Sequence, residues 1–72
     1  MDIKTLEYIH KLLVENDRAA KEEFTAAIRA VENAEEANVP ATSEMRKRLD
    51  DARRAKNQAY AALHVFEETD FR

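Results

Sequence analysis

Two histidines in this chain stand three positions from a glutamate: Glu7 precedes His10, and His64 precedes Glu67. Glutamate and histidine at this spacing bind metal ions in di-iron helix bundles, and two copies of each motif could converge in a dimer. The spacing is common in a Glu-rich helix, however. At about 100° per residue, Glu7 also projects roughly 60° away from His10, toward the polar side of the helix. We therefore predict no metal ligand and no cofactor.

Residues for covalent or phosphate chemistry are also missing from the sequence. There is no Cys to act as a nucleophile or zinc ligand, and there is no Gly to build a phosphate-binding loop. No Ser stands beside a His at a recognisable spacing. We predict that the protein is not an enzyme and has no catalytic residue.

Basic residues gather in the second half of the chain, in the run 46–48 and at Arg53, Arg54 and Lys56. They are spread around a helix and interrupted by Asp50 and Asp51. We expect them to face the acidic residues of the first half, which makes nucleic acid an unfavoured partner. A nucleic-acid-binding hairpin of the Rop type is the alternative, by analogy of fold alone.

Apolar residues at helical spacing predict two helices. The first runs over residues 3–37 after Asp2 as N-cap, and the second over residues 43–69 after Thr42 or Ser43 as N-cap. Asn38 can take the left-handed conformation that ends a helix, and the turn spans residues 38–42. The first stripe repeats at about 3.4 residues, close to the 3.5 of left-handed helix packing. Its members are Ile3, Leu6, Ile9, Leu13, Asp17, Ala20, Phe24, Ala27, Val31 and Ala34.

The short turn makes the two helices antiparallel neighbours. The second stripe comprises Met45, Leu49, Ala52, Lys56, Ala59, Leu63 and Phe66. We predict an alignment in which the numbers of facing residues sum to about 80. This alignment places large side chains opposite small ones, with Phe24 opposite Ala55 or Lys56. The stem of Lys56 can then lie along Phe24 while its ammonium reaches water.

Asp17 occupies a position of the first stripe where an apolar residue is expected. The predicted alignment places it opposite Leu63 and beside His64, so that Asp17 and His64 could form a pH-linked pair. Alternatively, Asp17 turns toward solvent or pairs with Lys21. A polar residue in a helical seam can also fix register and oligomeric state, which is the role we favour for Asp17 and Lys56.

The first helix is apolar over a wider arc than one partner helix can cover. A two-helix core of this length is marginal without disulfides, metals or oligomerisation. The first helix is also longer than the second, so its N-terminal apolar residues overhang. We predict an all-α fold, an antiparallel two-helix hairpin that forms a four-helix bundle as a homodimer. The expected oligomer interface comprises Leu6, Tyr8, Ile9, Leu12, Leu13 and Phe24.

The composition supports one small helical domain. The chain has 72 residues, 38% of them charged, and a formal net charge of −3, which argues against a general polyanion binder. The N-terminus does not resemble a signal peptide, and no stretch approaches the ~20 apolar residues that span a bilayer. We expect a cytoplasmic protein without a membrane partner.

The segments KTLEYIHKLL (4–13) and HVFEE (64–68) resemble short uncharacterised proteins of prophages and other mobile elements of Gram-positive bacteria. The resemblance covers only the two ends of the chain. It implies a bacterial cytoplasmic setting and a helical hairpin, and it assigns no chemistry to any residue. We expect a small assembly or protein–protein interaction module that binds itself and an unknown protein partner.

Overall fold

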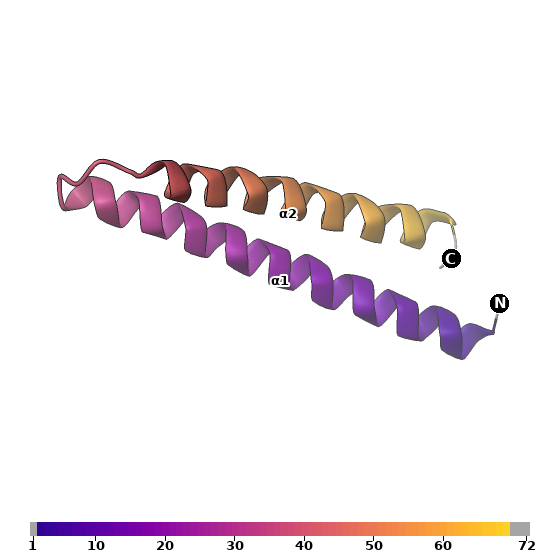
Figure 1. The fold of residues 1–72 in the computed structure, drawn as a ribbon. Helices are drawn as coiled ribbons and strands as arrows, with labels where there is room; N and C mark the ends of the chain where they lie inside the picture. The colour runs from indigo at the N-terminus through magenta and orange to yellow at the C-terminus, as the bar shows by residue number, and fades with distance from the viewer. Residues whose placement is uncertain (1, 70–72) are drawn as a thin grey trace.

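The computed structural model describes residues 2–69, and it forms two antiparallel helices joined by one short connection (Figure 1). α1 spans Ile3–Glu36 and α2 spans Ser43–Thr69. The described residues contain no strand. The predicted hairpin and its helix bounds are therefore confirmed to within one residue. In the described part of the chain, neither helix is long and apolar enough to cross a membrane.

α1 ends in a left-handed residue, as the sequence predicts. Asn38 has φ 58°, its N–H donates to the carbonyl of Glu35, and the N–H of Val39 donates to the carbonyl of Ala34 at 2.8 Å. This pair of bonds is the Schellman pattern, which satisfies carbonyls that the helix leaves free. Asn is among the few residues other than Gly that adopt this conformation readily. α1 therefore stops without a glycine.

The N-terminal caps of the two helices differ. The hydroxyl of Thr42 accepts a hydrogen bond from the N–H of Met45 at 3.1 Å, so Thr42 caps α2 as predicted. Asp2 has the extended backbone of a capping residue, and its carbonyl accepts from the N–H of Leu6. Its carboxylate makes no capping hydrogen bond, so the predicted side-chain cap of α1 is wrong.

The seam between the helices is built largely from small residues. The buried apolar side chains are Ala27, Ala34, Ala52, Ala59, Leu63 and Phe66. All of them belong to the two predicted stripes. Among the described residues, no large side chain is fully buried. The hairpin is therefore a thin rod, 54 × 15 × 14 Å, with a radius of gyration of 16.2 Å, where a compact chain of this length has about 11 Å.

The predicted contact between Phe24 and Lys56 is present, but the cross-helix contacts of His10 and Glu23 are shifted from the predicted alignment. The ammonium of Lys56 lies 5.0 Å from the centre of the Phe24 ring, as predicted. His10 contacts Glu67, however, where the alignment placed residue 70 opposite it, and Glu23 contacts Arg48 instead of Asn57. Figure 1 shows that the connection passes back beside the last turns of α1 before α2 begins. α2 therefore sits closer to the N-terminal end of α1 than predicted.

Candidate functional site

Asp17 lies in the seam and is the buried charged residue of the described chain, with 8% of its surface exposed. Its Oδ2 lies 2.8 Å from the Nζ of Lys21, one helical turn further along α1. Its Oδ1 is buried and has no hydrogen-bond partner among the described residues. A buried acceptor without a donor costs about 1–3 kcal/mol. The polar residue that interrupts the apolar stripe therefore lowers the stability of the seam.

Lys21 connects Asp17 to two aromatic rings of α2. Its ammonium lies 5.8 Å from the centre of the Tyr60 ring, within the range of cation–π attraction. The Tyr60 and His64 rings are 4.1 Å apart at their centres and tilted by 42°. Asp17 and His64 therefore lie at the two ends of one series of contacts, which runs through Lys21 and Tyr60.

This arrangement corrects the predicted Asp17–His64 pair. Among the described residues, no hydrogen bond or ion pair joins the two side chains, because Asp17 is bonded to Lys21 and His64 lies against Tyr60. The sequence-based alternative, pairing of Asp17 with Lys21, is the one the structure contains. Whether Asp17 fixes the helix register stays a prediction.

The two Glu/His motifs each contribute one residue to a contact between the helices. The Nε2 of His10 lies 2.9 Å from the Oε2 of Glu67, and the His10 ring stacks on Phe66 with 6.1 Å between ring centres. Glu7 is exposed and is not part of this contact. The described residues contain no group of three or more His, Cys, Asp or Glu side chains that could hold a metal ion. The alignment predicted from the sequence missed this contact because it placed residue 70 opposite His10.

The basic side chains of α2 take part in contacts within the hairpin. The Nε of Arg48 donates to the Oε1 of Glu23 at 2.6 Å across the two helices. This hydrogen bond lowers the pKa of the Glu23 carboxyl and raises the pKa of Arg48. Arg53 lies 3.7 Å from Asp50 on its own helix. These groups are exposed, so the pairs organise surface charge more than they stabilise the fold.

The predicted oligomer interface divides into two groups. Leu6, Ile9, Leu13 and Phe24 are half-buried in the hairpin. Tyr8 and Leu12 point away from α2, with 62% and 46% of their surfaces exposed. The second group therefore has more of its surface free for another molecule than the first.

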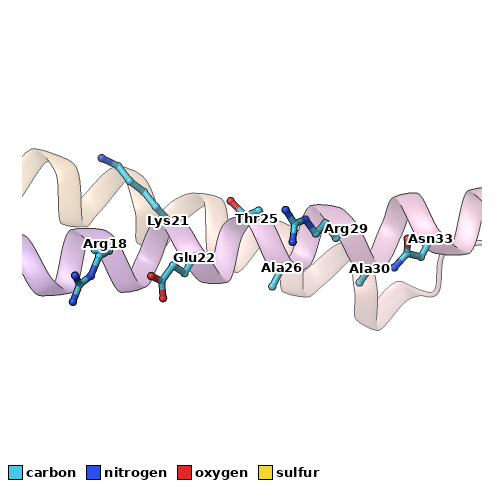
Figure 2. Close-up of a pocket in the computed structure, with 8 residues that line it drawn as sticks. All are labelled: Arg18, Lys21, Glu22, Thr25, Ala26, Arg29, Ala30 and Asn33. Atoms are coloured by element: carbon cyan, nitrogen blue, oxygen red, sulfur yellow. The ribbon is translucent and has the colours of Figure 1, made fainter.

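α1 also carries an open surface further along, on the side away from α2. Figure 2 shows residues between Arg18 and Asn33 lining this shallow depression, with α2 behind α1 in the view. All of its lining residues come from α1, and Ala26 and Ala30 form part of its floor. The outer side of α1 is therefore uncovered between Arg18 and Asn33.

Comparison of the chain with protein-family models, with curated proteins and with solved structures finds no match. The function must accordingly be argued from the hairpin itself.

Proposed function

We propose that this chain is a non-enzymatic helical hairpin that associates with itself, forming a four-helix bundle as a homodimer, and that it acts as an assembly or protein–protein interaction module. Its resemblance to short prophage and mobile-element proteins suggests an accessory factor of such an element, in the cytoplasm of its host. The second, unknown protein partner expected from the sequence would bind the assembled dimer.

The proposal rests on the exposed surface area of the chain, compared with that of a compact monomer of the same mass. The chain exposes 5623 Å². A compact monomer of 8.3 kDa exposes about 4600 Å² by the usual scaling of surface with mass. The excess of about 1000 Å² is close to the ~800 Å² that each partner contributes to a standard protein–protein interface. Dimerisation would thus bring the chain to the exposure of an ordinary globular protein.

The thin core supports the same proposal. Among the described residues, the buried apolar side chains are alanines together with two larger ones, Leu63 and Phe66. Each buried CH₂ contributes about 0.8 kcal/mol, so an alanine seam offsets little of the entropy lost on folding. Since the chain has no disulfide to restrict its unfolded state, a second hairpin is the remaining source of stability.

Sedimentation equilibrium from 1 to 200 μM tests the proposal. We expect a dimer in the upper part of this range and a thermal midpoint that rises with protein concentration, because mass action favours the folded dimer. A folded monomer with a constant midpoint would refute self-association. Fluorescence anisotropy with duplex and single-stranded oligonucleotides at two salt concentrations is the companion experiment. Steeply salt-dependent binding would instead favour the nucleic-acid alternative.

A further inference from the structure

An apolar stripe runs along α1 on a flank that α2 leaves uncovered. It comprises Tyr8, Leu12, Ala19, Ala26 and Ala30. At 100° per residue these five positions fall within about 40° of one another, so they form one straight line along the helix. The first four are exposed and Ala30 is half-buried. Glu23 lies beside the stripe on the side toward α2, and its carboxylate is already bonded to Arg48.

The sizes of these side chains are arranged symmetrically around Ala19. Leu12 and Ala26 lie seven residues to either side, and Tyr8 and Ala30 lie eleven residues to either side. In an antiparallel pair of identical helices related by a two-fold axis at Ala19, Leu12 would face Ala26 of the second copy, and Tyr8 would face its Ala30. Each large side chain then meets a small one, which allows closely packed helices to interdigitate. One patch used identically by both subunits is the geometry of a two-fold interface.

α2 repeats this symmetry on the same side of the hairpin. Ala55 lines a surface depression together with Glu23 and Arg48, which places it on the flank of the stripe. Ala62 follows one heptad later, and both alanines are exposed. Taken together, the cross-helix contacts of His10, Lys21, Glu23 and Phe24 place Ala19 on average level with about residue 58 of α2, which lies between Ala55 and Ala62. One two-fold axis therefore passes Ala19 of α1 and the midpoint of the α2 pair.

We infer that this face is the self-association surface and that its occupant is a second copy of the chain. α1 packs antiparallel on α1 of the partner around Ala19, and α2 packs antiparallel on α2 of the partner between Ala55 and Ala62. The inference rests on the proposed self-association and adds its face, direction and symmetry axis. The roughly 1000 Å² of excess exposed surface is enough for one standard interface, to which each partner contributes about 800 Å². This packing divides the predicted interface residues: Tyr8 and Leu12 contact the second copy, while Leu13 and Phe24 stay within the hairpin.

Disulfide trapping tests the axis, because the natural chain contains no cysteine. A residue on a two-fold axis meets its own copy, so Ala19→Cys should form a disulfide-linked dimer. Ala61→Cys is the matched control, since Ala61 is also an exposed helical alanine but lies on the outer side of α2. In a glutathione redox buffer, we expect the effective concentration of the thiols to be at least ~100-fold higher for Ala19→Cys than for Ala61→Cys.

A second cross-linking experiment tests whether the two α1 helices are antiparallel. An equimolar mixture of Tyr8→Cys and Ala30→Cys proteins should give mainly the mixed disulfide. If most disulfides instead join two Tyr8→Cys chains or two Ala30→Cys chains, the helices are parallel and the inference is overturned.

Sedimentation of the unmodified protein distinguishes a wrong interface from a failure of self-association itself. If it is a dimer but Ala19→Cys is trapped no better than Ala61→Cys, this face is wrong and self-association stands. If it is a monomer at 200 μM and neither variant is trapped, the proposed function fails with the inference. Preferential trapping of Ala19→Cys together with the mixed disulfide supports both.

Discussion

Replacing Asp17 with leucine should stabilise the protein, although it removes an ion pair. The Oδ1 of Asp17 is buried without a hydrogen-bond partner, so its removal recovers about 1–3 kcal/mol. The lost pair with Lys21 is an i,i+4 contact to a half-exposed ammonium, of the kind that contributes about 0.3–0.5 kcal/mol. The added apolar area is worth about 1.5–3 kcal/mol, against a packing strain of about 1–3 kcal/mol. We expect a net gain of about 1–3 kcal/mol.

The assay is urea denaturation of wild type and Asp17→Leu at one protein concentration, so that mass action affects both equally. Asp50→Leu is the matched control. The Asp50 side chain is 65% exposed and pairs with Arg53 at 3.7 Å, so the same substitution there removes an ion pair without relieving burial. Its effect should stay within about 0.5 kcal/mol. A loss of more than 1 kcal/mol in Asp17→Leu relative to Asp50→Leu would contradict this prediction, because the carboxylate would then be stabilising the seam.

The same variant tests the predicted role of Asp17 in fixing register. Without a polar residue in the seam, shifted pairings are no longer penalised. We expect Asp17→Leu to broaden NMR amide signals and to give a mixture of oligomers in sedimentation velocity. A single oligomeric species with sharp signals would reject the register role. The effect of Asp17 would then be limited to lowering the stability of the seam.

Four further substitutions, at three positions, test the turn, the cap of α2 and the cross-helix ion pair. Asn38→Gly should raise the free energy of unfolding by up to about 1 kcal/mol, because glycine holds the positive φ without strain, and Asn38→Ala should lower it in the same urea titration. Thr42→Ala should lower thermal stability by about 1 kcal/mol through loss of the cap on Met45, measured by calorimetry. Arg48→Gln should raise the lowered pKa of Glu23 toward its ordinary value in an NMR carboxyl titration. Because the folded pKa is lowered, the pair stabilises the protein above the unfolded pKa, and this contribution is lost as the pH falls through the folded one. An unchanged pKa in Arg48→Gln would assign the shift to another group.

The helix ends could be predicted because local chemistry determines them. Asn38 is suited to a left-handed backbone, Pro40 keeps the residue before it extended, and Thr42 offers a hydroxyl to the first free N–H groups. These preferences act within a few residues, so the sequence alone contains them. The missing side-chain cap at Asp2 shows the limit: the sequence identifies a residue able to cap but not the rotamer it adopts.

The contacts of the candidate site were harder to predict because they depend on the path of the connection. Running back beside α1, the connection shifts α2 by a few residues, enough to bring His10 to Glu67. Long side chains add a second uncertainty. Lys21 reaches both Asp17 and Tyr60, so it occupies the position that periodicity assigned to His64. A repeat of 3.5 residues defines which residues lie in the seam, but not which charged group reaches which partner.

The alanines of the chain link the thin seam to the proposed dimer. In the seam, Ala27, Ala52 and Ala59 are almost fully buried and let the helices approach closely, but each contributes roughly the burial of one methyl group. Ordering an alanine side chain costs no rotamer entropy, so further alanine layers add stability at little cost. A second hairpin packed on Ala19 and Ala55 would supply such a layer on both helices at once. A surface of small side chains gives an isolated hairpin little apolar burial, and in the proposed dimer the same small side chains would let a second copy approach closely.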